Sequence, residues 1–277
     1  MRTALSALTL RRPTSLKTAL AMLRDDPALV PLAGCTDLYV AMNFGTLDDS
    51  ATRFLDLWPL GALRRITLHD GTLVIGALAP YSAIIRSRLV RRHLPMLVDA
   101  ARQIGGPQIQ NRGTLGGNIA NGSPAADSLP VLAAADAVIV LTSAAGERRV
   151  ALTEFYTGYR ASVRRSDELI TAVEIPQQQG AQWFRKVGTR AAQAISKIVM
   201  AAVRDARPRV ALGSVAATVV RVPQVERALA AGDLDAAVEA LAREIQPIDD
   251  VRSTADYRRA VAANLLRRFW ADTAPAG

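Results

Sequence analysis

Apolar and polar positions in the first fifty residues alternate between strand-like and helix-like spacing. Short apolar runs at Leu8–Leu10 and Leu29–Ala33 predict strands. A helix is expected between them, because apolar residues recur there at three- and four-residue spacing, at Leu16, Ala19, Leu20 and Leu23. A second helix is expected around Leu38–Phe44, after a sharp turn at Gly34-Cys35-Thr36 that directs helix amides toward a bound group. This segment therefore predicts a compact β-α-β-α unit.

The next stretch mixes short strands with helices. One helix is predicted over Leu89–Ala101. Another is expected to have Ser123 as its cap and Pro124 as its first residue, and to run to about Ala135. His69-Asp70-Gly71 is typical of a hairpin turn. Apolar runs predict strands at Arg53–Leu57, Ile66–Leu68, Leu73–Ile75, Ala137–Leu141, Arg149–Leu152 and Glu168–Ile175.

A change of composition at Gln177–Gly180 indicates a linker. Strands are expected after it, at Gln182–Val187, Ile195–Arg204 and Arg209–Ala216. Helices are expected after these strands, at Gln224–Ala231, Leu234–Glu244 and Thr254–Phe269. Strands followed by helices predict a separate α+β domain. We expect a first domain over residues 1–178, with subdomains of about 1–52 and 53–178, and a second domain over residues 179–277.

Composition excludes several classes of protein. The 277 residues are 50% hydrophobic, and no apolar run approaches the roughly 18 residues that span a membrane. Arg11-Arg12 could begin an export signal, but charged residues interrupt the segment after this pair, so a cytoplasmic protein is expected. The net charge is +9, yet the arginines are scattered without aromatic residues that could stack on bases. We therefore expect no nucleic acid, and favour contact with an acidic protein partner.

The sequence holds one cysteine, Cys35, and two histidines, His69 and His93. This excludes a disulfide framework, a cysteine-ligated iron–sulfur cluster and a Cys/His zinc site within the chain. No metal ligands and no side chains for catalysis are predicted. Any redox chemistry has to come from a bound cofactor.

The stretch Ile104–Pro130 is rich in glycine and polar residues and is typical of a long functional loop. Two glycine-bearing turns suit an anion, one at Pro31–Leu38 and one at Thr114–Asn118. Neither has the spacing of a nucleoside triphosphate loop or of a Rossmann turn. Two such turns in one chain suit a pyrophosphate, because its two phosphates need donors from both sides.

Three single residues have competing interpretations. Asp127 is placed in the first turn of a helix, where the dipole favours an acid even without a ligand, so structural and functional roles are equally supported. Cys35 is either a reactive thiolate or, more simply, a small residue in a glycine-like position. A solvated lysine is the default interpretation of Lys186.

Three motifs carry a resemblance to a known family. They are AGCTDL at Ala33–Leu38, QIQNRGTLGGNIANGSPAAD at Gln108–Asp127 and FRKVGTRAAQAIS at Phe184–Ser196. Together they resemble the FAD-binding medium subunit of the molybdenum hydroxylases, the family of xanthine dehydrogenase, carbon monoxide dehydrogenase and aldehyde oxidoreductases. The resemblance covers nearly the whole chain. It implies an α+β protein with a vanillyl-alcohol-oxidase-type (PCMH-type) FAD-binding domain of two subdomains, followed by a carbon monoxide dehydrogenase flavoprotein C-terminal domain.

The resemblance also implies where FAD binds. It assigns the FAD pyrophosphate to Pro31, Leu32, Ala33, Gly34, Cys35, Thr36, Asp37 and Leu38, and to Thr114, Leu115, Gly116, Gly117 and Asn118. Asp127 would anchor the adenosine or ribitol side, with Ser123 assisting. Ile104 would lie near the flavin, Ile170 would contact it from a strand, and Lys186 would be a basic residue near the isoalloxazine.

Two residues depart from the family pattern. Cys35 stands where the first motif usually has a second glycine, so the close approach of the backbone must tolerate a Cβ there. Ile104 is aliphatic where some relatives have an aromatic ring. The lack of further cysteines also argues against the iron–sulfur loop of the benzoyl-coenzyme-A branch.

The implied function is that of an oxidoreductase subunit that passes electrons through FAD from a two-[2Fe–2S] small subunit to NAD⁺ or another acceptor. A large subunit would hold the molybdenum cofactor, in a hetero-oligomer expected to be a dimer of heterotrimers. The alternative is a stand-alone FAD-dependent oxidase or reductase with its own small-molecule substrate. The sequence names neither the substrate nor the acceptor.

Overall fold

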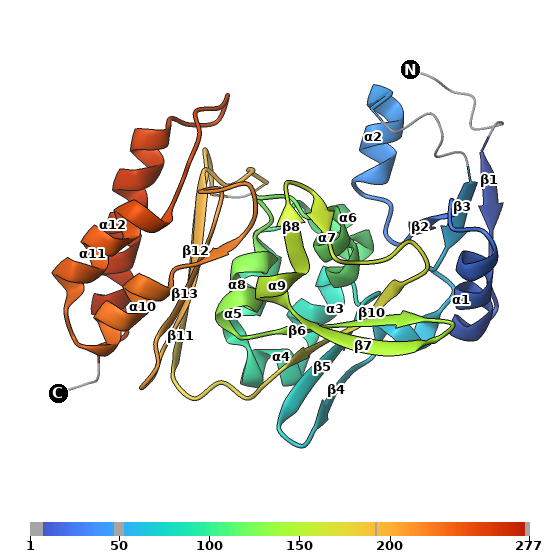
Figure 1. Ribbon diagram of the computed structural model, residues 1–277, viewed down its shortest axis with the longest axis horizontal. Coiled ribbons are helices and arrows are strands. Elements are labelled where there is room, and N and C mark those ends of the chain that lie inside the picture. The colour runs from blue at the N-terminus through green and yellow to red at the C-terminus, as the bar shows by residue number, and fades with distance from the viewer. Residues whose placement is uncertain (1–7, 47–52, 192, 275–277) are drawn as a thin grey trace.

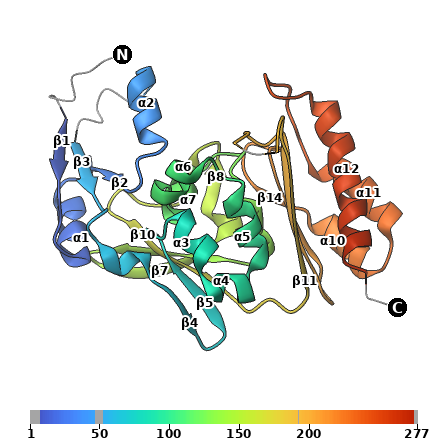
Figure 2. The same cartoon turned by 180° about the vertical axis from the view of Figure 1, so that it is seen from behind.

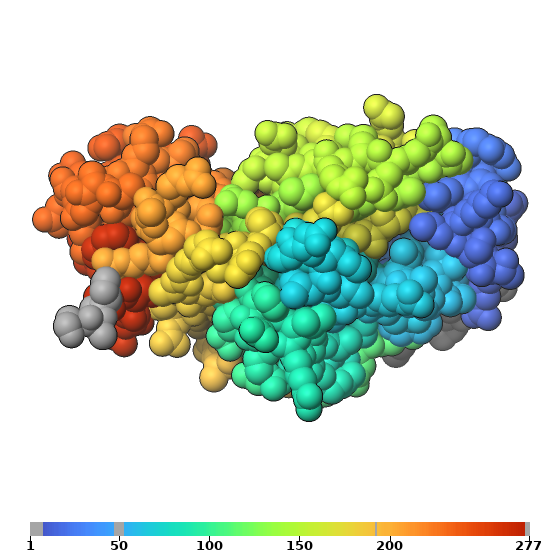
Figure 3. Space-filling model, turned by 90° about the horizontal axis from the view of Figure 1, so that it is seen from below, coloured from blue at the N-terminus to red at the C-terminus, as the bar shows by residue number. Residues whose placement is uncertain are grey.

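The structure is a computed structural model, and it describes residues 8–46, 53–191 and 193–274. The molecule is elongated, with the N-terminal unit at one end and the C-terminal helices at the other (Figure 1, Figure 3). The described strands form a small parallel sheet, two larger antiparallel sheets and a two-stranded antiparallel hairpin, and helices lie between the two larger sheets. The expected α+β architecture is confirmed.

The first sheet is parallel and has the strand order β1-β3-β2. Its strands are β1 (Thr9–Arg11), β2 (Val30–Leu32) and β3 (Arg53–Asp56). Helix α1 (Leu16–Asp25) packs on it through its apolar face, which contributes to a core cluster with Leu55 and Leu57. The boundary expected near residue 52 lies outside the described residues. The strand Arg53–Asp56 was expected to open the second subdomain, but it is the central strand of the first sheet.

The second sheet is antiparallel and has the order β4-β5-β10-β6-β7. Its strands are β4 (Ile66–His69), β5 (Thr72–Gly76), β6 (Val138–Ser143), β7 (Gly146–Ala151) and β10 (Leu169–Ile175). The hairpin expected at His69-Asp70-Gly71 joins β4 to β5, and Asp70 and Gly71 have φ of 47° and 78°. Glycine and aspartate tolerate this left-handed backbone better than other residues do.

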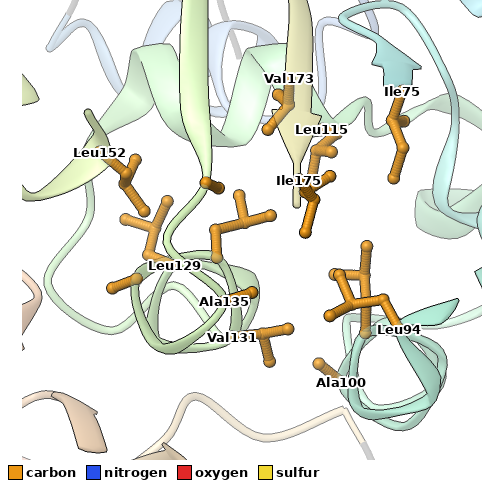
Figure 4. Close-up of a cluster of buried hydrophobic side chains, with 14 of the residues drawn as sticks. Ile75, Leu94, Ala100, Leu115, Leu129, Val131, Ala135, Leu152, Val173 and Ile175 are labelled. Carbon is orange, nitrogen blue, oxygen red and sulfur yellow. The ribbon is translucent and has the colours of Figure 1, made fainter. Parts of the chain in front are cut away.

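Helices cover one face of the second sheet. After a 3₁₀ turn at Gly61–Arg64 come α3 (Tyr81–Arg86), α4 (Arg88–His93), α5 (Pro95–Arg102), α6 (Pro107–Arg112), α7 (Leu115–Asn121), α8 (Ser128–Ala134) and α9 (Leu152–Phe155). Figure 4 shows Ile75, Val173 and Ile175 of the sheet facing the side chains of α5 and α8 across this core. A short hairpin of β8 (Tyr156–Gly158) and β9 (Ala161–Ser162) follows α9.

Three expectations in this region were wrong. The helix predicted over Leu89–Ala101 is two helices, because Pro95 begins α5 and has no N–H to continue α4. The helix predicted to begin at Pro124 begins at Ser128, after a turn in which Ala126 N donates to Ser123 O. The stretch expected to be one long loop contains α6, α7 and the start of α8.

The third sheet has the order β11-β12-β13-β14 and is antiparallel. Its strands are β11 (Ala181–Val187), β12 (Ile198–Arg204), β13 (Arg209–Gly213) and β14 (Val220–Arg221). The helices α10 (Pro223–Ala230), α11 (Leu234–Glu244) and α12 (Ala255–Asp272) cover its outer face (Figure 1). These strands followed by helices confirm the expected C-terminal module, apart from the unpredicted short strand β14.

The third sheet contributes to two hydrophobic cores. Every second residue of β12 (Val199, Ala201 and Val203) joins the core of the second sheet and its covering helices. The alternate residues, Met200 and Ala202 among them, join the core of α10–α12. Because side chains alternate across a strand, β12 is buried on both faces. The C-terminal module is therefore packed directly against the first domain.

Helix α2 (Leu38–Phe44) stands apart from the layers in both ribbon views (Figure 1, Figure 2). It has no buried residue, although six of the seven letters in LYVAMNF are apolar. Tyr39, Val40 and Phe44 are 55%, 50% and 79% exposed. The helix ends at Gly45, which adopts the left-handed conformation usual after a helix.

Candidate cofactor site

The loop that joins β2 to α2 presents a row of free backbone N–H groups. β2 ends at Leu32, α2 begins at Leu38, and Cys35 between them has φ of 65°. Within the described part of the chain, no hydrogen bond uses the amides of Gly34–Asp37. Successive amides around a left-handed residue converge into an anion-binding concavity called a nest. We call Gly34–Asp37 the nest loop.

Gly34 brings the nest loop against the segment that leads into α7. A Cβ placed on Gly34 would lie only 1.9 Å from Arg112 O and 3.1 Å from Gly113 N. A Cβ on Gly113 would in turn lie 3.6 Å from Thr36 Oγ1. This backbone contact requires glycine at position 34, and it brings the two sequence turns together although they are far apart in the chain.

The remaining residues of the first turn hold this loop in place. Pro31 pairs with Leu55 in the parallel sheet. Asp37 Oδ1 accepts a hydrogen bond from Asn121 Nδ2 at 3.2 Å, which ties the start of α2 to the end of α7. Ala33 faces Gly117, because a Cβ on Gly117 would lie 3.9 Å from the Ala33 Cβ.

The second turn is the first turn of helix α7. Thr114 caps the helix, and its Oγ1 accepts from Gly117 N at 3.0 Å. The Leu115 amide donates to Ala79 O at 3.1 Å, and the Gly116 amide donates to Ala77 O at 2.8 Å. Backbone donors were expected from both turns, but these three amides are already engaged, and the nest loop is where free amides lie. In the second turn, Gly117 faces Ala33 of the first turn.

Buried hydroxyl groups position the Asn118 side chain. Ser128 Oγ donates to Asn118 Oδ1 at 2.6 Å, and Tyr81 Oη lies 3.3 Å from Ser128 Oγ. Burial raises the pKa of the Tyr81 hydroxyl, so that group stays protonated. Neither Tyr81 nor Ser128 was predicted, because nothing in their local sequence indicates contact across 47 positions of chain.

Asp127 and Lys186 form a buried ion pair between the two domains. Lys186 Nζ on β11 donates to Asp127 Oδ2 at 2.6 Å and to Gln103 O at 3.0 Å. Burial raises the pKa of Asp127 to about 6, and the charge of Lys186 lowers it in part. The other carboxylate oxygen, Oδ1, is buried and has no hydrogen-bond partner within the described residues.

This pair corrects one sequence interpretation and bears on another. Lys186 is not a solvated lysine, because its side chain is 6% exposed. Asp127 is the N-cap residue of α8 but makes no side-chain capping hydrogen bond, and its Oδ2 accepts from Lys186 instead. A buried polar oxygen without a partner is costly, and a donor from a bound water or ligand would remove that cost.

Of the three looser assignments, Ile104 and Ser123 lie near the buried pair, and Ile170 lies in the second sheet. Ile104 follows Gln103, the residue that accepts from Lys186, so it lies beside the buried pair. Ser123 is half-buried, and its Oγ accepts from Ala125 N at 3.3 Å in the turn before α8. Ile170 is buried in β10 opposite Leu141. β10 belongs to the second sheet, whereas β2, which leads into the nest loop, pairs with β3 in the first sheet.

A second polar feature beside the nest loop was not predicted from the sequence. The guanidinium groups of Arg112 and Arg64 both stack on the Trp58 ring.

Two other features concern membrane insertion and metal binding. Over the described ranges, no helix is long and apolar enough to cross a membrane. No group of three or more His, Cys, Asp or Glu residues that could hold a metal ion occurs within those ranges.

Comparison with known proteins identifies the two halves of the chain. Residues 6–178 match the family described as the FAD binding domain in molybdopterin dehydrogenase, and residues 182–273 match the CO dehydrogenase flavoprotein C-terminal domain. The chain is 33% identical over 263 residues to the xanthine dehydrogenase FAD-binding subunit of Escherichia coli O157:H7, covering 89% of each chain. It is 31% identical to the glyceraldehyde dehydrogenase medium chain of Sulfolobus acidocaldarius, covering 95% of this chain and 97% of the relative.

Solved structures are similar over nearly the whole length. Carbon monoxide dehydrogenase from Hydrogenophaga pseudoflava superposes with a TM-score of 0.89 at 28% identity, covering 96% of this chain and 98% of that chain. Quinoline 2-oxidoreductase from Pseudomonas putida 86 has the same fold, with a TM-score of 0.89 at 24% identity, covering 96% of each chain.

The local geometry fits the cofactor that these families bind. The free amides of the nest loop suit the anionic pyrophosphate of FAD, and the partnerless Asp127 Oδ1 suits a hydroxyl or N–H donor of the same molecule. From the family matches over both halves of the chain, the protein is a FAD-binding medium subunit of the molybdenum hydroxylase family, which includes the xanthine and carbon monoxide dehydrogenases.

Proposed function

We propose that this subunit carries electrons through FAD from a two-[2Fe–2S] small subunit to NAD⁺ or another acceptor. A large subunit with the molybdenum cofactor would act on the organic substrate, in a dimer of heterotrimers. The names of the relatives as medium or FAD-binding subunits of dehydrogenases support this role. Bound FAD supplies the redox chemistry, and the chain supplies binding, orientation and electrostatics.

The observation that carries the proposal is the row of unused amides at Gly34–Asp37. Four adjacent N–H groups without acceptors are costly unless a ligand or water satisfies them. A pyrophosphate accepts several hydrogen bonds and carries negative charge, so it satisfies them well.

The proposed contacts extend from this loop to β11. We assign FAD binding to Pro31, Leu32, Ala33, Gly34, Cys35, Thr36, Asp37, Leu38, Ile104, Thr114, Leu115, Gly116, Gly117, Asn118, Ser123, Asp127, Ile170 and Lys186. Asp127 and Lys186 differ from the rest, because their charges are buried and act on each other. Removing either charge leaves the other without compensation.

Replacement of Lys186 tests the assignment. Lys186→Met leaves the Asp127 carboxyl buried without its cation, and we expect the FAD occupancy of the purified chain to fall by about tenfold. Lys17→Met removes the same charge from an exposed position on α1 and is expected to retain wild-type FAD. Wild-type FAD occupancy in the Lys186→Met variant would show that the Asp127–Lys186 pair does not contribute to FAD binding.

The electron-transfer role is tested in the co-purified complex. Addition of the organic substrate should bleach the visible flavin absorbance only when all three subunits are present, and an acceptor should restore it. If the isolated FAD-loaded chain alone oxidises or reduces an organic substrate, the protein is a stand-alone flavoenzyme and this proposal is wrong.

A further inference from the structure

Trp58 holds two arginine side chains at one indole ring. The Arg112 guanidinium carbon lies 3.8 Å from the ring centroid and that of Arg64 lies 4.5 Å from it. Arg64 also donates a hydrogen bond from Nη2 to the Trp58 carbonyl oxygen. Both guanidinium groups therefore lie against an aromatic face, which attracts cations but carries no net charge.

Among the described residues, these two cations lack an acidic partner. The ion pairs that those residues form include neither Arg64 nor Arg112. The nearby carboxylate of Asp56 is already engaged, since Oδ2 accepts from Arg12 Nε at 3.1 Å and Oδ1 accepts from Trp58 N at 3.0 Å. Two like charges at one ring repel each other, and an anion beside them would remove that repulsion.

The arginine pair lies beside the nest loop. Trp58 follows Leu57, whose amide donates to Leu32 O at 2.9 Å at the end of β2. The Arg112 carbonyl oxygen is the atom that a Cβ on Gly34 would strike at 1.9 Å. Burial raises the pKa of the Cys35 thiol, while the positive charge of Arg112 lowers it in part. The charge of Arg112 therefore acts electrostatically on a residue of the nest loop.

We propose that Arg112, held on Trp58 and assisted by Arg64, supplies the positive charge that neutralises the FAD pyrophosphate beside the amides of the nest loop. This inference rests on the FAD site proposed above. Nest amides alone bind an anion through dipoles, whereas a guanidinium adds a full charge and charge-assisted hydrogen bonds. Arg112 is thus a cofactor-affinity residue, and Trp58 is a positioning residue that acts through it.

The alternative is that the stack only joins the two turns mechanically. In that case, the affinity for FAD would not depend on the charge of residue 112. A charge-based role predicts that binding weakens with salt, and that part of this salt dependence disappears with Arg112.

The test measures FAD binding to the flavin-free chain by quenching of flavin fluorescence over a range of salt concentrations. Arg112→Gln should weaken FAD binding at low salt by about tenfold and flatten its salt dependence. Arg112→Lys, which keeps the charge, should retain most of that dependence. The matched control is Arg92→Gln, which removes an exposed charge from α4 and should bind FAD like wild type.

Trp58→Leu supplies a second, independent arm. It leaves both arginines in the chain but removes the ring that positions them, so FAD binding should weaken by less than in Arg112→Gln. Equal FAD affinity and equal salt dependence in Arg112→Gln and Arg92→Gln would overturn the inference. Absence of FAD binding by the wild-type chain would instead overturn the FAD site on which it rests.

Discussion

At the scale of single residues, Cys35 occupies a left-handed backbone conformation that residues other than glycine rarely adopt. Its φ of 65° costs a residue with a Cβ about 1 kcal/mol. Cys35→Gly should therefore raise the free energy of unfolding of the flavin-free chain by about 1 kcal/mol, measured with denaturant. FAD content should be unchanged, because the nest uses backbone groups.

Cys35→Ala is the matched control for this change. It removes the thiol but keeps the Cβ, so its stability should stay close to that of wild type. If alanine stabilised the chain as much as glycine does, the thiol and not the backbone strain would be responsible.

Asp127 makes stability depend on pH. Its pKa is raised by burial to about 6 from a usual value of 3.8. As pH falls, the folded chain therefore takes up this proton at a higher pH than the unfolded chain does. The stabilising contribution of that proton is present below about pH 4 and is lost as pH rises through about 6. Between about pH 5 and pH 7, flavin-free wild type should lose about 1 kcal/mol relative to Asp127→Asn, in urea unfolding at each pH. If the free energies of unfolding of the two proteins changed equally with pH, a raised pKa of Asp127 would be contradicted.

At the scale of elements, the adjacent glycines that open α7 have different environments. A Cβ on Gly116 would lie 2.6 Å from the Ala77 Cβ and 2.8 Å from Ala77 O, inside the core. A Cβ on Gly117 would meet the Thr114 Oγ1 at 2.8 Å and otherwise face Ala33 within the proposed FAD site. The two positions should therefore respond differently to the same substitution.

Valine at each position separates folding from binding. Gly116→Val should destabilise the fold by about 3 kcal/mol, because it overpacks a buried contact. Gly117→Val should cost about 1 kcal/mol through the helix cap, yet lose FAD because it adds bulk opposite Ala33. Thermal unfolding and flavin absorbance of both variants check this, and FAD retention by Gly117→Val would contradict the placement of FAD beside Ala33.

The sequence predicts most strands and helices, because their apolar spacing is strong. It does not reveal that β3 belongs to the first sheet, since parallel pairing joins segments distant along the chain. Helix α6 was also not predicted, although Pro107 after a glycine is a helix-start signal that could have been recognised.

Within the candidate site, local sequence identifies the nest loop but not its surroundings. The glycine motif points to Gly34, whereas the burial of Lys186 depends on Asp127 across 59 positions. The Trp58 stack likewise depends on three segments meeting. Long-range pairing of charges and rings leaves no periodic pattern from which it could be inferred.

At the scale of the whole molecule, the two-sided burial of β12 joins both domains into one folding unit. We expect a single transition in heat or denaturant, because unfolding either core exposes the other face of that strand. Tryptophan fluorescence can report on the two domains separately, because Trp58 follows β3 while Trp183 and Trp270 lie on β11 and α12. A variant that keeps only Trp58 and a Trp58→Phe variant should share one midpoint, and two separated midpoints would show independent domains.

The exposed helix α2 has a practical consequence for preparing the subunit in isolation. Tyr39, Val40 and Phe44 on it are largely exposed in the described chain, so a concentrated solution of the free subunit should self-associate through them, despite the net charge of +9. Tyr39 and Phe44 lie beyond the nest amides along the chain, so they can be exchanged for glutamine without altering the loop backbone. An engineered pair of this kind would give a flavoprotein suited to storage, spectroscopy and crystallisation on its own.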